Sequence, residues 1–148
     1  MNFESIHREH REWWSRNRAG EASDLPALGL FKALRNFAHP LLQSRYKPRP
    51  GIDWHGQAEE AIGDMFMYLC SVAQAADLRM AGESNPWTLL SAEEAAAYTA
   101  EKIAYLVRDQ IQENLSWAVA AVLDLCRVCV VDPEVACRRA LCKLRSVS

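Results

Sequence analysis

The chain has 148 residues, of which half are hydrophobic and 24% are charged, and its formal net charge at pH 7 is −2. This composition excludes an intrinsically disordered chain, and the length suits a single domain that buries roughly 70% of the surface of its unfolded chain. The small net charge gives no general attraction to nucleic acid or to an anionic membrane, so nucleic acid is not an expected partner.

Residues 3–18 predict a charged packing helix with one apolar stripe. Its two histidines, His7 and His10, lie one helical turn apart with Glu4 nearby, so the three could hold a transition metal. A solvated charged face with one half-buried histidine is the commoner arrangement, because no further ligand is in view.

A second helix is predicted over residues 25–43, where apolar side chains recur at helical spacing after Ser23-Asp24. Pro40 is expected to end or kink it. Two prolines and a glycine then predict a linker over residues 45–52. The basic side chains of this linker leave two interpretations open, a solvated connector or a loop that contacts phosphate.

The central predicted helix covers residues 54–80, with Asp53 as its N-cap. Apolar side chains recur along it at steps of three and four residues and define a core stripe. At 100° per residue, Glu60 and Asp64 fall on the side opposite this stripe, and Glu59 falls on its flank. Other apolar side chains lie off the stripe, which is typical of a helix buried on two sides, in a bundle or at a subunit interface.

A capping box, Ser91-Ala-Glu-Glu94, predicts the start of the next long helix, which is expected over residues 91–114. Glu101 lies on a polar face of this helix, where ordinary charge pairs along an exposed surface would explain it. Alternatively, Glu101 and the acids of the central helix point into one cavity of the bundle and share a divalent cation such as Mg²⁺, which prefers oxygen ligands. In that case Lys102 and Arg108 would neutralise phosphate oxygens.

Residues 115–131 are apolar nearly all round and are expected at the centre of the bundle or across a subunit interface. Asp132-Pro133 then starts a final helix, with Asp as the cap and Pro at the first position. No alternating strand pattern occurs anywhere. The sequence therefore predicts an all-α helical bundle of about five helices in one domain, residues 1–148.

Neither a secretory signal nor a membrane span is predicted. The first residues lack the apolar core of a signal peptide, and the apolar run 115–131 is too short for a bilayer and contains Asp124 and Arg127. The five cysteines do not have the spacing of a secreted disulfide framework. We therefore expect a soluble cytoplasmic protein with reduced thiols and no membrane partner.

Two stretches resemble one enzyme family. Glu59-Glu60-Ala61-Ile62-Gly63-Asp64, followed by Met-Phe-Met-Tyr-Leu, is similar to the acidic helix of the MazG-type nucleotide pyrophosphohydrolases, and the segment from Val128 to Arg145 is similar to the closing segment of that family. The family pattern has Glu-x-x-Glu on one helix and Glu-x-x-Asp on the next. This chain departs from it, because Ala61 stands three residues before Asp64, and Glu113-Asn-Leu-Ser116 stands where a second acidic pair is expected.

The resemblance implies an all-α fold, with a MazG-like core at about residues 54–146 behind N-terminal packing helices at about 3–43, and assembly into a homo-oligomer. It also implies that acids on paired helices hold Mg²⁺ against a nucleoside triphosphate. The candidate metal ligands are Glu59, Glu60, Asp64 and Glu101, of which Glu60 and Asp64 are the catalytic candidates. The candidate phosphate-binding residues are Lys102, Arg108 and Lys143.

Two functions are therefore predicted side by side. The first is a Mg²⁺-dependent nucleoside triphosphate pyrophosphohydrolase, in which a carboxylate orients the attacking water and cations neutralise the developing charge. The second is a non-catalytic helical homo-oligomer that binds a small ligand or a protein partner, which its surplus of apolar side chains favours. A third and weaker hypothesis, an RNA-acting helical protein, rests on Arg35 and His39, which resemble the Arg-Asn…His motif of HEPN ribonucleases at a shorter spacing.

Overall fold

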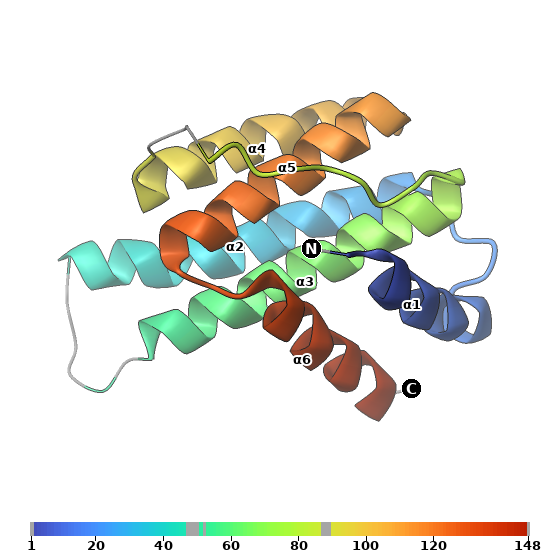
Figure 1. Cartoon of the computed structure of the whole chain (residues 1–148), viewed down its shortest axis with the longest axis horizontal. Coiled ribbons are helices and arrows are strands. Elements are labelled where there is room, and N and C mark those ends of the chain that lie inside the picture. Colours follow the sequence, from blue (N-terminus) through green and yellow to red (C-terminus); the bar gives the residue numbers. More distant parts are fainter. Residues whose placement is uncertain (1, 47–50, 52, 87–89, 148) are drawn as a thin grey trace.

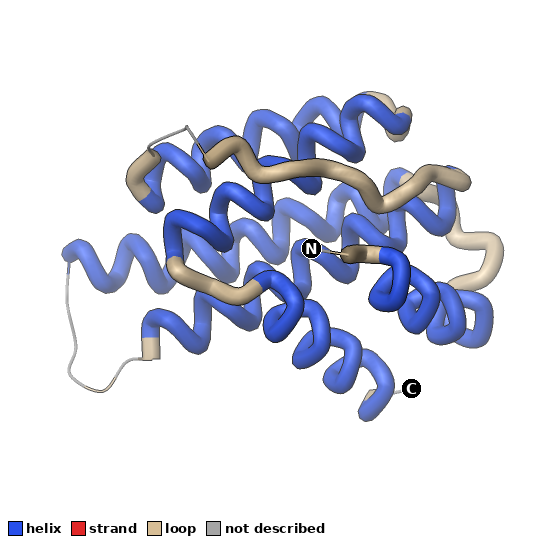
Figure 2. Tube along the Cα trace, viewed as in Figure 1, coloured by secondary structure: helices blue, strands red, loops and turns tan. Residues whose placement is uncertain are grey.

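The computed structural model describes residues 2–46, 51, 53–86 and 90–147, and within these ranges it has six α-helices and no strand (Figures 1 and 2). The helices are α1 (Glu4–Asn17), α2 (Asp24–Tyr46), α3 (Trp54–Ala76), α4 (Ala92–Arg108), α5 (Gln112–Cys129) and α6 (Pro133–Ser146). The prediction of an all-α bundle is confirmed. The described helices number six, where about five were predicted.

Helix α3 forms the centre of the bundle. It packs along α2 on one side and against α5, α6 and α1 on the others, while α4 lies on α5 and α2 (Figure 1). Side chains are buried around most of the circumference of α3, as its apolar pattern predicts. The largest fully buried side chains of the core are Phe37, Phe66, Ile6, Leu30, Ile62, Met65, Leu69, Ile103, Leu106, Leu115, Leu125 and Leu141.

Side-chain caps fix the starts of three helices where the sequence predicts them. The Asp53 carboxylate accepts a hydrogen bond from the Gly56 N–H at 2.9 Å at the start of α3. The capping box of α4 has both of its hydrogen bonds, and the Asp132 carboxylate accepts from the Glu134 N–H at the start of α6. These caps satisfy N–H groups that the helices themselves leave unpaired, so they fix where each helix begins.

Three helix ends differ from the predictions. Helix α2 passes through Pro40 and continues to Tyr46, so the predicted linker loses its first two residues, and its residues 47–50 and 52 lie outside the described part of the chain. Helix α3 ends at Ala76, because Asp77 adopts the left-handed conformation with φ of 55°. Helix α4 ends at Arg108, where the Gln110 amide donates hydrogen bonds to the last free carbonyl groups of the helix.

An extended segment, residues 77–86, follows α3 and runs along α5 (Figure 2). The backbone of Arg79 is hydrogen-bonded to the Gln112 amide in both directions, and the Ser84 hydroxyl and Asn85 N–H donate to the Asp124 carboxylate. Between these anchors Gly82 lies so close to α5 that an added Cβ would be 2.7 Å from the Ser116 carbonyl oxygen. We call residues 77–86 the strap, since both ends are fastened to α5.

Candidate functional site

The acids singled out from the sequence lie where α3 crosses α6. The two helices approach closely at Gly63, where an added Cβ would be 2.5 Å from the Ala136 carbonyl oxygen. The cations of α6 therefore reach the acids of α3. Glu59 pairs with Arg139 at 2.5 Å, and the Lys143 ammonium lies 2.7 Å from Asp64 and 3.3 Å from Glu60.

Lys143 fills the space between Glu60 and Asp64 as an internal cation. Its partial burial disfavours the charged form, but the hydrogen bonds and charges of Asp64 and Glu60 outweigh this and raise the pKa of the ammonium above its usual value. Two carboxylates one turn apart repel each other unless a cation lies between them. In this structure the cation is a lysine.

Glu101 does not join these acids. It lies on α4, which packs on α2 and α5, and its carboxylate is exposed and 3.7 Å from the Lys102 ammonium. Among the described residues, no group of three or more histidine, cysteine or acidic side chains is placed to hold a metal ion. Within the described part of the chain, Glu101 is thus separated from the other three predicted Mg²⁺ ligands, which lie together on α3.

The predicted phosphate-binding residues are likewise separated. Lys102 and Arg108 lie on α4, Arg108 being exposed near its last turn, whereas Lys143 lies on α6. Lys102 faces the rings of Tyr98, Tyr105 and Trp117 instead of the acids of α3.

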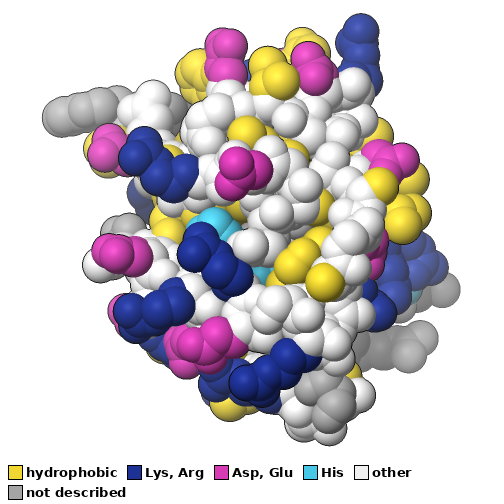
Figure 3. Space-filling view, turned by 90° about the vertical axis from the view of Figure 1, so that its right-hand side faces the viewer, with side chains coloured by type: hydrophobic (Ala, Val, Ile, Leu, Met, Phe, Trp, Pro, Cys, Tyr) yellow, Lys and Arg dark blue, Asp and Glu magenta, His cyan; other side chains and the backbone are white. Residues whose placement is uncertain are grey.

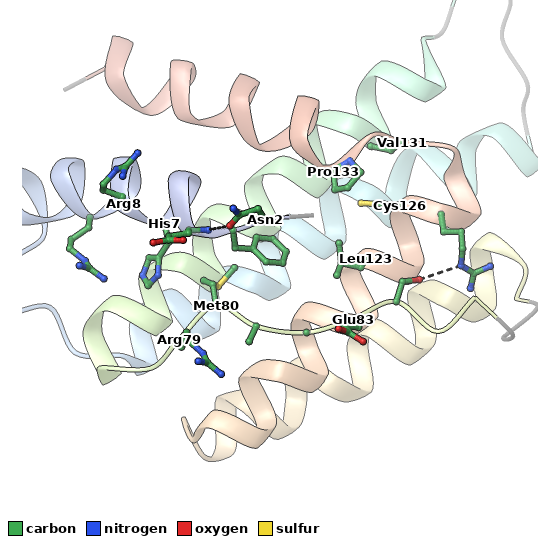
Figure 4. A pocket seen from close by; sticks show the side chains of 17 residues that line it. Asn2, His7, Arg8, Arg79, Met80, Glu83, Leu123, Cys126, Val131 and Pro133 are labelled. Atoms are coloured by element: carbon green, nitrogen blue, oxygen red, sulfur yellow. Dashed lines mark hydrogen bonds between the residues drawn. The ribbon is translucent and has the colours of Figure 1, made fainter.

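A large cleft, which was not predicted from the sequence, lies beside α1. It has a volume of about 1060 Å³ and lies between the first half of α1, the strap, the last half of α5 and the start of α6 (Figure 4). Its apolar walls come from Phe3, Met80, Leu123, Cys126, Val131 and Pro133. Because these side chains come from segments far apart in the sequence, no single sequence motif predicts the cleft.

Four arginines line this cleft against two glutamates, Glu4 and Glu83, although the whole chain has a net charge of −2. Figure 3 shows basic and acidic side chains interspersed over the end of the molecule that faces the viewer. Arg127 is engaged by the strap, donating to Ser84 and to the Asn85 carbonyl oxygen, and Arg11 donates to the Gln74 amide oxygen. Two of the four arginines, Arg11 and Arg127, thus already donate hydrogen bonds to protein groups.

The guanidinium groups of Arg8 and Arg79 have no ion pair and no hydrogen bond within the described part of the chain. Arg79 is held through its backbone only, so its side chain is available to a ligand (Figure 4). Two guanidinium groups without partners in a concave site are suited to a carboxylate or phosphate, which they bind through paired N–H groups.

His7 also lines the cleft and is 92% buried, being 8% exposed. Its Nε2 has no hydrogen-bond partner among the described residues. Burial, together with the charge of Arg11, lowers the pKa of His7, so the ring is neutral at pH 7. The three-residue metal set considered for Glu4, His7 and His10 is not formed, because His10 is fully buried and hydrogen-bonded to the Ser71 hydroxyl at 3.1 Å.

Comparison with models of protein families, with curated proteins and with solved structures finds no match. The resemblance to MazG-type enzymes therefore rests on the two sequence stretches alone. Among the described residues no single helix is long and apolar enough to cross a membrane, although α5 and α6, bent by 110° relative to each other, meet that test as a pair.

Proposed function

We propose that the protein is a non-catalytic binding protein that holds a small organic anion in the cleft beside α1. One observation carries the proposal: Arg8 and Arg79 line a concave site of about 1060 Å³ and have no partner for their guanidinium groups in the described part of the chain. Both side chains are exposed and therefore solvated in the free protein, and their N–H groups, which no protein acceptor engages, can donate to a carboxylate or phosphate of a ligand in the cleft.

The walls of the cleft favour a ligand with an apolar body. Phe3, Met80 and Leu123 give an apolar surface, while the arginines stand around it. Ligand sites typically combine such apolar walls with a few polar groups that fix orientation. His7 is the candidate for a neutral hydrogen bond to the ligand, because its Nε2 has no protein partner among the described residues.

The test uses two anions of different size and polarity, decanoate and ATP, with decanol as the neutral counterpart of decanoate. Binding is measured by calorimetry for the wild type, Arg8→Met and Arg79→Met. Because a hydrogen bond to a charged group contributes about 1.5–3 kcal/mol, we expect each substitution to weaken the preferred anion about tenfold or more. Decanol should not respond to either substitution.

The matched control is Arg35→Met, since Arg35 is an exposed arginine of α2 that lies away from the cleft. Affinity should be unchanged in this variant. If neither anion binds, or if Arg35→Met weakens binding as much as Arg8→Met does, the cleft is not the site and the proposal is wrong.

The pyrophosphohydrolase stays the second proposal, favoured by one observation. Glu60 and Asp64 line a small pocket of about 180 Å³ together with Asn36 and Gln57, between α2 and α3. Oxygen donors of this kind suit a nucleotide complex with Mg²⁺ if Lys143 moves from the acids to the phosphate. Its test is Mg²⁺-dependent release of pyrophosphate from a panel of nucleoside triphosphates: turnover that Asp64→Ala abolishes and Arg79→Met leaves unchanged would place function at α3 and α6 instead of the cleft.

A further inference from the structure

Lys102 is enclosed by three aromatic rings on the far side of the bundle from α1 and α6. Its ammonium lies 5.1 Å from the ring centre of Tyr98, 5.4 Å from that of Tyr105 and 5.1 Å from that of Trp117. These distances are within the range of about 6 Å over which a cation is attracted to the face of an aromatic ring. The rings come from two neighbouring helices, α4 and α5 (Figure 1).

The three rings form a surface cage and not a part of the core. Tyr105 is 44% exposed and Trp117 is 50% exposed, whereas the side chain of Lys102 between them is only 17% exposed. A lysine side chain at the surface normally keeps its ammonium in water. Here the ammonium lies among rings, with one carboxylate, Glu101, at 3.7 Å. The Lys102 side chain is therefore mostly covered, and its ammonium lies against the faces of three rings.

We propose that Tyr98, Tyr105 and Trp117 form a recognition site for a quaternary ammonium group, and that Lys102 occupies this site until such a ligand displaces it. A primary ammonium is compact and strongly hydrated, so its entry into the cage has a large desolvation cost. A quaternary ammonium is more weakly hydrated and its methyl groups contact several rings at once, which is why aromatic cages recognise it.

Displacement needs no change of fold. Lys102 has a flexible four-carbon stem, and its only carboxylate contact within 4 Å among the described residues is with its exposed sequence neighbour Glu101. Once it leaves, its ammonium returns to water, where repulsion from the bound ligand is weak because of the high dielectric constant. Among the described residues, Arg18 also lies over an aromatic ring, that of Trp13 at 5.9 Å. This cation contacts a single ring and is not enclosed as Lys102 is.

The probe is choline chloride, and its neutral isostere 3,3-dimethylbutanol serves as the reference. Binding is followed by NMR through the indole N–H signal of Trp117, which is assigned among the five tryptophans as the signal lost in Trp117→Leu. We expect a saturable shift with choline and none with the isostere. Tyr105→Leu should weaken choline binding about two- to fivefold, and Lys102→Met should tighten it by a similar factor, because exposed cation–ring contacts have this magnitude.

Lys32→Met on α2 is the matched control, since it removes one exposed cation away from the cage. It should leave choline binding unchanged, and NMR spectra of each variant establish that it is folded. Equal shifts with choline and with the isostere, or an unchanged affinity in folded Tyr105→Leu, would overturn the proposal. A peptide containing trimethyllysine is titrated in parallel. Tighter binding of the peptide than of choline indicates a protein as the source of the ammonium group, and tighter binding of choline indicates a free small molecule.

Discussion

His10 shows how far the environment of one residue can depart from what its sequence neighbours indicate. It lies between charged residues of α1, yet its ring is completely buried and contacts Trp13 and Trp14. Burial, with a smaller effect of the neighbouring His7, lowers the pKa of His10 to about 4. Nδ1 of His10 has no hydrogen-bond partner among the described residues, so a proton there would be stabilised by nothing that the structure places nearby.

We therefore expect the protein to lose stability as the pH falls from about 6.5 to about 4. In this range the unfolded chain binds a proton at His10 while the folded chain does not, so the unfolded state is favoured. The loss from this residue amounts to about 3 kcal/mol at most. His10→Gln keeps a polar group that can reach Ser71 and removes the titration. Urea unfolding followed by tryptophan fluorescence should show a smaller pH dependence in this variant, and an unchanged pH dependence would contradict the assignment.

For single residues, the sequence predicts which side of a helix a side chain lies on but not its partner. The acids of α3, Glu59, Glu60 and Asp64, are an example. The helical period places Glu60 and Asp64 opposite the core stripe and Glu59 on its flank. It does not say what faces them. Their partners, Arg139 and Lys143, come from a helix about 80 residues further along the chain, and the sequence singled out only Lys143, as a candidate phosphate ligand.

At the scale of the elements, Gly63 determines how closely α3 and α6 cross. Its missing side chain leaves room for the Ala136 carbonyl group, and the facing Ala140 is also small. This crossing is what brings Lys143 to Asp64 and Glu60. In the sequence Gly63 is a glycine inside a helical pattern, which usually has a packing reason but does not reveal the neighbouring helix.

Gly63→Ala should lower the free energy of unfolding by up to about 2 kcal/mol. Alanine favours a helix by about 1 kcal/mol over glycine, but its Cβ would be 2.5 Å from backbone that cannot move freely, and overpacking of this kind typically costs about 1–3 kcal/mol. Urea unfolding measures the change. Gly63→Ser adds one further atom and should lower the free energy of unfolding more than Gly63→Ala does. If both variants are as stable as the wild type, α3 and α6 can move apart without loss of stability.

The break between α4 and α5 follows Arg108, earlier than the predicted helix end at residue 114, and its cause is visible only in the fold. No glycine or proline interrupts Arg108 to Gln112. The side chains of Gln110 and Asn114 instead donate to carbonyl groups at the end of α4, which takes the place of the continuing helix. The helix starts, in contrast, were predictable because a capping side chain and its N–H partner are only two or three residues apart.

The whole molecule brings together segments that no local pattern connects. The cleft uses α1, the strap, α5 and α6, and the arginines that line it looked in the sequence like ordinary solvated charges. The all-α class was predictable because it needs only the helical period. A site between four elements depends on how those elements pack, which the period leaves open.

Exposed leucines on one face of α2 predict that the whole molecule associates with itself. Leu25, Leu28 and Leu42 are 57%, 52% and 53% exposed on the side of α2 that does not pack on α3 or α4. Leu28 and Leu42 are 14 residues apart, or about 21 Å along the helix. These leucines, interspersed with the exposed Lys32, Arg35 and His39, are the candidate contact surface for a second copy of the chain.

We expect the chain to form a symmetric homo-oligomer through this face and Leu28→Glu to weaken it. A buried leucine contributes about 1.5–3 kcal/mol, and in a two-fold interface each substitution occurs twice, so the association constant should fall about a hundredfold or more. Sedimentation equilibrium measures it. Val135→Glu removes an exposed apolar side chain of α6 and should leave association unchanged. A wild type that stays monomeric at high micromolar concentration would contradict self-association, and dissociation by Val135→Glu alone would move the interface from α2 to α6.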